Sequence, residues 1–514
     1  MKLGELARAL ERPTVLPPDR LEGEVSDIAY DSRKVKPGSL FVAVRGFQSD
    51  GHLFILQAVQ RGAVAVVAEH RNSMAAATDT PQLIVEDSRR ALALLADEFY
   101  GHPSQRLTLI GITGTNGKTT TTYLVKSIIE AGGKTAGLIG TIDYRVGDRI
   151  YLAPNTTPES LDLQRLFAEM IGLGATHCVM EVSSHALTLG RTAGCRFAAA
   201  AFTNLTQDHL DFHETMEAYF QAKLSLFAGL PPDRHVVINL DDGRAPDIMR
   251  ATKAAVLTTG MTDSANVHPR GEVRHGIGGL SFEAATPSGP VIIESPLVGR
   301  HNIYNILTAI GVGAALGFGA DVIGQGIRNM KAVPGRMEKV DEGQPFGVIV
   351  DYAHTEDALV RLLEAVRDIT ASRIITVFGC GGDRDRTKRP KMGSAAISGS
   401  DVVIVTSDNP RTEDPLGIIS EVERGMGAGV KTATTDAPPG GKIPYYVIPE
   451  RRAAVRHAIG LARPGDVVVL AGKGHEDYQI VGNKKLPYDD REAAREEIKK
   501  RQRTDNRGQM TENR

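Results

Sequence analysis

Apolar and polar positions along the chain form two alternating patterns. Short apolar runs such as 107–112 (LTLIGI), 198–204 and 467–471 are typical of buried strands. Longer stretches between them, such as 118–130, are typical of helices. Strands that alternate with helices favour a parallel, doubly wound sheet with helices on both faces. The pattern therefore predicts an α/β protein.

The chain divides into three blocks, and we expect domains at 1–104, 105–335 and 336–498. A length of 514 residues agrees with this, since a domain averages about 150 residues. In the first block we expect a helix over Ser88–Tyr100, capped by Ser88. The strands predicted there lie at 39–45, 63–68 and 82–86.

The second and third blocks repeat the strand–helix alternation. In the second block, further strands are predicted at 177–182 and 235–239, and short alternating runs over 266–297 indicate an antiparallel addition. In the third block, strands are predicted at 347–350, 374–378, 402–406 and 467–471. The tail 499–514 is polar and without periodicity, so we expect a flexible, solvated end rather than a nucleic-acid contact.

Composition narrows the class of protein. The net charge is −2, which argues against nucleic acid or an acidic membrane as the main partner. No apolar run reaches the roughly 18 residues of a membrane span. Three widely spaced cysteines, Cys178, Cys195 and Cys380, form neither a disulfide framework nor a zinc motif. We therefore expect a cytoplasmic globular protein.

The segment Gly111–Thr120 (GITGTNGKTT) carries the strongest chemical signal. A strand leads into a glycine-rich loop, and the loop opens a helix at Lys118. Backbone N–H groups at such a helix start bind phosphate, a lysine reaches the outer phosphates, and the following Thr119 can hold Mg²⁺. Because the strict P-loop pattern has a glycine five residues before Gly117, which this chain lacks, we predict a variant P-loop.

Polar groups follow the ends of two predicted strands. Glu181 ends one strand, and Asp208 and His209 follow another. Each alone is typical of a solvated polar residue, but together they favour a Mg²⁺ and ligand crevice at the carboxyl edge of the sheet. Lys223 lies in an amphipathic helical stretch, and its position there predicts only a surface lysine.

In the third block, four predicted strands each end in a polar cluster. The clusters are DYAH (351–354), GCGGDRDR (379–386), DNPR (408–411) and GKGHE (472–476). Four clusters on one sheet edge favour a binding crevice over ordinary loops. Arg384 and Arg411 can hold carboxylates in bidentate fashion, and Glu476 can hold an ammonium. This combination suits an amino-acid ligand.

In the first block, Asp31–Arg33 and Gly46–Gly51 flank the strand at 39–45. Their residue types are typical of turns, and the pattern alone favours turn chemistry over function.

Together these segments resemble the Mur ligase family over nearly the whole chain. GTNGKTT (114–120), NTTPES (155–160), EVSSHAL (181–187), TNLTQDHLDFH (203–213), GRHNIYN (299–305), PGRME (334–338), DYAH, GCGGDRDR, DNPR and GKGHEDYQ (472–479) occur in the family order. The resemblance implies a small α/β N-terminal domain that binds UDP, a central doubly wound P-loop ATPase domain, and a C-terminal Rossmann-like α/β domain for an amino acid. It also implies a monomeric ligase of peptidoglycan precursor synthesis that activates a carboxylate as an acyl phosphate.

The resemblance also assigns roles to individual residues. It implies that ATP is bound by Gly114, Thr115, Asn116, Gly117, Lys118, Thr119, Thr120, Asn302, Asp351 and His354. It implies that magnesium is bound by Thr119, Glu181, His209 and Lys223, and that Lys223 is carbamylated, as in the family. It assigns catalysis to Lys118, Glu181, His209 and Lys223. The UDP-muramoyl dipeptide is assigned to Ser32, Asn155, Thr156, Thr157, Ser183 and Arg191. The incoming diamino acid is assigned to Arg384, Asp408, Asn409, Pro410, Arg411, Gly472 and Glu476.

Arg411 bears on the choice of amino acid. Within the family, members that add lysine replace this arginine, so DNPR implies meso-diaminopimelate, whose second carboxylate pairs with a guanidinium. Three alternatives remain: a lysine-adding ligase, a folylpolyglutamate-type ligase, and a nucleotide-gated binding module without ligase activity.

Overall fold

The computed structural model describes residues 1–11, 13–17, 20–46, 49–433 and 442–512. The chain divides into two compact units. The first comprises 1–268, 285–291 and 304–326, and the second comprises 269–284, 292–303 and 327–514. The predicted boundaries of three domains stay a prediction, because the two compact units are divided at other residues.

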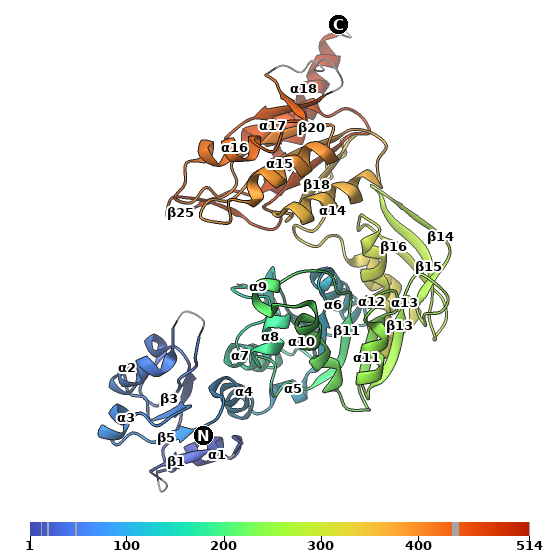
Figure 1. The fold of residues 1–514 in the computed structure, drawn as a ribbon. Coiled ribbons are helices and arrows are strands. Elements are labelled where there is room, and N and C mark those ends of the chain that lie inside the picture. Colours follow the sequence, from blue (N-terminus) through green and yellow to red (C-terminus); the bar gives the residue numbers. More distant parts are fainter. Residues whose placement is uncertain (12, 18–19, 47–48, 434–441, 513–514) are drawn as a thin grey trace. The chain divides into compact units, whose positions relative to one another are not determined.

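The first unit begins with a five-stranded sheet, part of the blue segment in Figure 1. Its strands are in the order β1-β5-β4-β3-β2. Its strands are β1 (Thr14–Leu16), β2 (Asp27–Ala29), β3 (Ser39–Val42), β4 (Ala65–Ala68) and β5 (Gln82–Ile84), of which only β1 is antiparallel to its neighbour. The helical segments are α1 (Leu3–Arg8), η1 (Ser32–Lys34), η2 (Gly51–Phe54), α2 (Ile55–Gln60), α3 (Ser73–Ala77) and α4 (Ser88–Phe99). The predicted cap was wrong by one residue: the Asp87 carboxylate accepts from the N–H groups of Arg89 and Arg90, and Ser88 is the first helical residue.

The same unit contains an eight-stranded sheet in the order β13-β12-β11-β6-β10-β7-β8-β9. The strands are β6 (Thr108–Thr113), β7 (Ala136–Ile139), β8 (Asp143–Val146), β9 (Arg149–Leu152), β10 (His177–Glu181), β11 (Phe197–Phe202), β12 (His235–Asn239) and β13 (Ala255–Thr259). The strands from β13 to β7 are parallel, and β8 and β9 add an antiparallel edge. The helices are α5 (Pro103–Arg106), α6 (Lys118–Ala131), α7 (Ser160–Gly172), α8 (Ser184–Thr188), α9 (Leu210–His213), α10 (Met216–Ala228) and α11 (Ala245–Ala251). Helices α12 (His301–Ala315) and α13 (Ala320–Asn329) each contribute residues to both units.

The second unit contains the sheet β14-β15-β16, from β14 (His268–Gly276), β15 (Gly279–Ala285) and β16 (Val291–Ser295), strands that begin or end at the unit boundary. Its main sheet runs β17-β18-β23-β19-β20-β22-β21. Those strands are β17 (Glu338–Lys339), β18 (Gly347–Asp351), β19 (Ile374–Phe378), β20 (Val402–Val405), β21 (Gly429–Lys431), β22 (Ile443–Val447) and β23 (Val467–Ala471). The helices are α14 (Glu356–Arg367), α15 (Lys388–Gly399), α16 (Pro415–Glu423), α17 (Arg451–Leu461) and α18 (Asp490–Glu512), and β24 (Tyr478–Val481) pairs with β25 (Lys484–Pro487).

Both faces of the main sheet are buried. Alternate side chains of β19 enter different apolar clusters: Ile374 and Phe378 pack with α14, α15 and α16, whereas Ile375 and Val377 pack with α17 and α18. A parallel sheet covered on both faces is the doubly wound arrangement that the sequence predicts.

The tail is helical in the part of it that the structure describes, and its expected flexibility stays a prediction. Helix α18 continues to Glu512, while the final two residues lie outside the described ones. Helix formers such as Lys, Arg, Gln and Glu extend the helix beyond the buried Ile498, which anchors it to the sheet, so apolar periodicity alone missed it.

Candidate active site

The glycine loop connects β6 to α6 and requires glycine at two positions. Gly114 and Gly117 have φ angles of +148° and +84°. A Cβ atom on Gly114 would lie 1.9 Å from Thr203 Oγ1, and one on Gly117 would lie 2.2 Å from Asn305 Oδ1. The loop therefore packs backbone against the next strand end and opens a 14-residue helix, the geometry of a phosphate site.

Two lysines share one carbonyl oxygen of this loop. Lys118 Nζ donates to the Gly114 carbonyl at 3.0 Å and to the Thr115 carbonyl at 2.8 Å. Lys223 Nζ donates to the same Gly114 oxygen at 2.8 Å. Lys223 is 1% exposed and lies over the Tyr219 ring, so the prediction of a surface lysine is wrong.

Burial strongly lowers the pKa of the Lys223 amine, and the neighbouring charge of Lys118 lowers this pKa further. The nearby Asp208 carboxylate opposes the shift only in part. This shift favours the neutral amine over the ammonium form. A neutral amine is nucleophilic, whereas an ammonium is not.

Glu181 ends β10, the neighbour of β6, and is 1% exposed. Its carboxylate accepts from the Thr141 backbone N–H at 2.8 Å and from the Thr141 hydroxyl at 3.0 Å. Gly140 leaves room for this carboxylate, because a Cβ there would lie 2.6 Å from Glu181 Oε1. The contacts fix the carboxylate at the carboxyl edge of the sheet, where sequence analysis places it.

His209 precedes α9 in a left-handed conformation, with φ +52°. Its ring lies 4.8 Å from that of His185, and its Nε2 atom lies 3.6 Å from Asp208 Oδ2. Burial lowers the pKa of His209 against the attraction of Asp208, and Lys118 and Lys223 contribute to the same direction. Burial likewise lowers the pKa of His185 to about 4. Both imidazoles are therefore neutral at pH 7 and can act as ligands or acceptors.

A magnesium site can be judged from this donor set. Thr119 is buried at the start of α6, and Glu181 supplies one carboxylate. Among the residues that the structure describes, no three His, Cys, Asp or Glu side chains gather as a metal cage. Mg²⁺ usually keeps water and substrate phosphates with one or two protein carboxylates, so this sparse set suits it.

The segment after β9 contacts the loop after β10. The buried Thr157 hydroxyl donates to the Glu181 carbonyl at 2.8 Å and accepts from the Ser183 N–H at 3.1 Å. Arg191 Nη1 donates to the Thr157 carbonyl at 3.0 Å. Thr156 Oγ1 lies 3.1 Å from Thr141 Oγ1, and the Asn155 carbonyl accepts from a tyrosine hydroxyl. The structure thus brings five residues of the predicted dipeptide site together beside Glu181.

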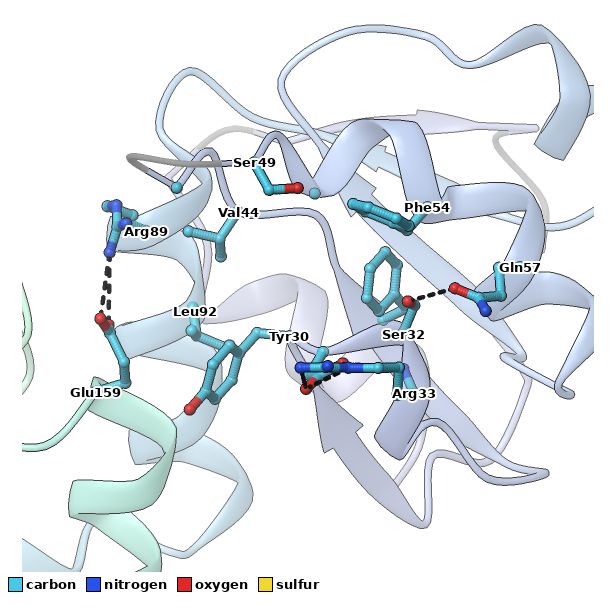
Figure 2. A pocket seen from close by; sticks show the side chains of 14 residues that line it. Tyr30, Ser32, Arg33, Val44, Ser49, Phe54, Gln57, Arg89, Leu92 and Glu159 are labelled. Carbon is cyan, nitrogen blue, oxygen red and sulfur yellow. Dashed lines mark hydrogen bonds and ion pairs between the residues drawn. The ribbon is translucent and has the colours of Figure 1, made fainter. Parts of the chain in front are cut away.

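A cavity of about 570 Å³ lies beside the first sheet (Figure 2). It is lined by Tyr30, Asp31, Ser32, Arg33, Phe41, Val44, Gly46, Ser49, Gly51, Phe54, Gln57, Arg89, Leu92 and Glu159. Ser32 donates to Gln57 Oε1 at 2.7 Å in its wall. Both turn segments of the first block contribute residues, although positions 47 and 48 lie outside the described chain. Turn chemistry alone could not reveal that these segments line one cavity.

In the second unit, hydrogen bonds fix the backbone of Arg411 in an unusual conformation. Its φ is +53°, unusual for a residue with a side chain. Its N–H donates to the Ile480 carbonyl at 3.1 Å, and its carbonyl accepts from the Gly482 N–H at 2.7 Å. Its Nη1 atom donates to the Gly382 carbonyl at 2.7 Å. The hairpin of β24 and β25 thereby fixes a strained conformation, a common feature of functional sites.

The Arg384 guanidinium donates to the Asp383 carbonyl at 3.2 Å. Among the described residues, no carboxylate lies within 4.0 Å of the Arg384 or Arg411 side-chain nitrogens. Two guanidinium groups without a protein counter-ion are available to anionic ligands.

Lys473 was missed by the sequence analysis, although it stands inside the GKGHE cluster. It is fully buried, and its Nζ lies 3.1 Å from Asp408 Oδ1, 3.3 Å from Glu476 Oε2 and 3.1 Å from Asn409 Oδ1. It therefore ties three predicted amino-acid-binding residues together. Gly472 lies beside them, since a Cβ there would be 3.6 Å from Asp408 Oδ2, and Pro410 belongs to the same turn.

The remaining predicted nucleotide residues also belong to the second unit. Asp351 ends β18, and its carboxylate accepts from the N–H groups of Met337 and Ala353. Burial raises the pKa of Asp351 against the effect of these hydrogen bonds. His354 Nδ1 lies 2.7 Å from the Tyr352 carbonyl, and Asn302 donates to the Val298 carbonyl at 2.7 Å.

The sheets and the glycine loop define a class: a multidomain α/β protein with a P-loop-type nucleotide site. Family models cover most of the chain: "Mur ligase family, catalytic domain" over 24–100, "Mur ligase middle domain" over 112–313, and "Mur ligase, glutamate ligase domain" over 335–474. The chain belongs to the Mur ligase family. The predicted three-domain α/β fold is confirmed.

A relative from Solibacter usitatus is 49% identical over 97% of this chain and 98% of its own. One from Geobacillus thermodenitrificans is 48% identical over 93% and 96%. Both are named UDP-N-acetylmuramoyl-L-alanyl-D-glutamate–2,6-diaminopimelate ligase. A solved structure of a ligase of that name is 31% identical and covers 98% of this chain and 99% of its own, with a TM-score of 0.71.

Within the described ranges, no helix combines the length and apolar character that crossing a membrane requires.

Proposed function

We propose that this protein is an ATP-dependent ligase that joins meso-2,6-diaminopimelate to the D-glutamyl γ-carboxylate of UDP-N-acetylmuramoyl-L-alanyl-D-glutamate. The reaction serves peptidoglycan precursor synthesis and releases ADP and phosphate. The proposal is supported chiefly by relatives named for this reaction, which are 48–49% identical to this chain over nearly its whole length.

The first step activates a carboxylate. A carboxylate is a poor electrophile, and transfer of the ATP γ-phosphoryl group to its oxygen creates an acyl phosphate with a good leaving group. Gly114–Thr120 would hold the ATP phosphates, with Asn302, Asp351 and His354 serving the nucleotide. Lys118 would stabilise the charge on the transferred group by position and electrostatics.

Thr119, Glu181, His209 and a carbamylated Lys223 would serve Mg²⁺, which supplies charge neutralisation for the phosphates when bound. The lowered pKa of Lys223 supports the carbamate, since only a neutral amine adds CO₂. Addition forms an N–C bond and releases one proton, so a cationic side chain becomes an anionic one. Lys118 and the ammonium form of Lys223, which share the Gly114 carbonyl oxygen, repel each other, whereas Lys118 and a carbamate on Lys223 would attract each other.

The second step is attack of the incoming amine on the acyl phosphate, with loss of phosphate. Arg384 and Arg411 would hold the amino acid's carboxylates, and Asp408, Asn409, Pro410, Gly472 and Glu476 would form the rest of its site. Lysine has one carboxylate fewer. Leaving a desolvated guanidinium unpaired costs about 2–5 kcal/mol, enough for more than tenfold selectivity.

The UDP-muramoyl dipeptide would occupy the cavity beside the first sheet through Ser32, and its peptide end would reach Asn155, Thr156, Thr157, Ser183 and Arg191. The cavity volume of about 570 Å³ suits part of such a ligand. We place the reaction in the cytoplasm, where ATP is available and the free thiols of Cys178, Cys195 and Cys380 stay reduced, and we propose a monomer.

The test is ADP release from the purified protein with Mg²⁺, ATP, the UDP-muramoyl dipeptide and meso-diaminopimelate. We expect turnover only when all three substrates are present. Turnover with ATP alone would favour the nucleotide-gated module, and turnover with a folate substrate and glutamate would favour a folylpolyglutamate-type ligase. The family match over 24–100 and Arg411 both favour the diaminopimelate reaction.

A further inference from the structure

Glu159 joins the cavity of the first sheet to the loops around Glu181. It lines the cavity and directly precedes α7. One of its oxygens lies 2.8 Å from Arg191 Nη2, and both oxygens lie 3.5 Å from Arg89 Nη1, a residue of α4 (Figure 2). The Glu159 side chain is 19% exposed, so the two ion pairs are largely shielded from solvent.

The contacts continue without a break from Glu159 to the end of β10. Arg191 uses its other terminal nitrogen, Nη1, to donate to the Thr157 carbonyl. The Thr157 hydroxyl in turn donates to the Glu181 carbonyl. One carboxylate thus holds the guanidinium that fixes the backbone of the predicted dipeptide-binding segment.

Helix α7 has further contacts with the segments around the first sheet that do not involve Glu159. The Tyr30 hydroxyl donates to Asp162 Oδ2 at 2.6 Å, two residues after the start of α7. Leu161 is buried in the apolar cluster of the first sheet. Loss of the Glu159 charge should therefore leave the two sheets joined, and change mainly the orientation of Arg191.

We propose that Glu159 is a positioning residue for the UDP-linked substrate. It would align Arg191 and Thr157 with the cavity, so that a substrate whose nucleotide occupies the cavity delivers its peptide carboxylate next to Glu181. Without the carboxylate, two guanidinium groups lose their shared counter-ion, repel each other, and release the Thr157 segment. This inference rests on the proposed function.

The experiment compares Glu159→Gln, which keeps the size but removes the charge, with Asp162→Asn as the matched control. The control removes one carboxylate from the first turn of α7, three residues after Glu159, where it contacts Tyr30 and not Arg191. Steady-state ADP release gives KM for each substrate, and calorimetry gives Kd for the UDP-muramoyl dipeptide and for UDP alone.

For Glu159→Gln we expect KM and Kd of the UDP-muramoyl dipeptide to rise about tenfold, while Kd of UDP and KM of ATP and diaminopimelate stay within about twofold. Asp162→Asn should leave all of these values within about twofold. The double variant Glu159→Gln, Arg191→Ala should be no worse than Arg191→Ala alone, because residues that act through one another are not additive.

Equal weakening of UDP and the UDP-muramoyl dipeptide, or values equal to those of the parent protein, would overturn the inference. If Glu159→Gln fails to fold by circular dichroism, Glu159→Asp, which keeps the charge but withdraws the carboxylate from Arg191 by one methylene group, tests the same ion pair with the same expected split. Failure of the proposed function is distinct from these results, since the unaltered protein would then lack turnover with diaminopimelate.

Discussion

Lys223 offers a test that does not depend on turnover. We expect the unaltered protein, equilibrated with ¹³C-labelled bicarbonate, to carry a carbamate on this lysine, and Lys118→Met to lose it. Lys118 both disfavours the ammonium form of Lys223 and would attract the carbamate. Removal of the Lys118 charge therefore stabilises the ammonium form of Lys223 and destabilises its carbamate.

The size of this electrostatic effect follows from the distance between the two amines. The Gly114 carbonyl oxygen lies 3.0 Å from Lys118 Nζ and 2.8 Å from Lys223 Nζ. The two nitrogens are therefore no more than 5.8 Å apart. At an effective dielectric constant of about 20, two positive charges at that separation repel by about 3 kcal/mol. Loss of this term should reduce the carbamate equilibrium on the order of 100-fold.

The assay is ¹³C NMR of the carbamate carbon at mildly alkaline pH, with Lys223→Met as the blank. The signal should grow as pH rises and disappear on acidification, because CO₂ adds only to the unprotonated amine and burial lowers the pKa of that amine. A signal of equal size in Lys118→Met would refute the electrostatic reasoning. No signal above the blank in the unaltered protein would refute the carbamate.

Three further substitutions test other parts of the account. Arg411→Ala should raise KM for meso-diaminopimelate about 30-fold or more without changing KM for ATP, and an unchanged value in the ADP-release assay would remove Arg411 from the site. Gly114→Ala places a Cβ atom 1.9 Å from Thr203 Oγ1, so calorimetry should find ATP binding lost; normal affinity would contradict the loop geometry. Arg451→Met leaves the fully buried Asp490 unpaired and should lower the free energy of unfolding by about 3–5 kcal/mol, whereas an unchanged urea midpoint would contradict that cost.

Local features were predictable from the sequence wherever one segment carries the whole signal. The predicted helix 118–130 agrees with α6 to within one residue, because the glycines that open and close it are part of the same pattern. The four strands predicted in the third block appear for the same reason, as continuous apolar runs between turn residues.

Features that depend on distant partners were not predictable. Lys223 is buried because a carbonyl 109 positions away in the chain accepts its hydrogen bond, and no periodicity records that contact. Lys473 likewise acquires its role from Asp408, on a different strand end. The cavity depends on turns whose composition is ordinary and whose proximity is set by the sheet.

The proposed reaction and its choice of amino acid are tested together by the product formed from the UDP-muramoyl dipeptide and ATP with meso-diaminopimelate or with L-lysine. Mass spectrometry identifies the ligated product, and ADP release gives kcat/KM for each amino acid. We expect the diaminopimelate product, with kcat/KM at least about tenfold above that for lysine, from the carboxylate–guanidinium pair. Equal efficiency with both amino acids would refute the proposed specificity, and ADP release without a ligated product would refute the proposed ligase activity.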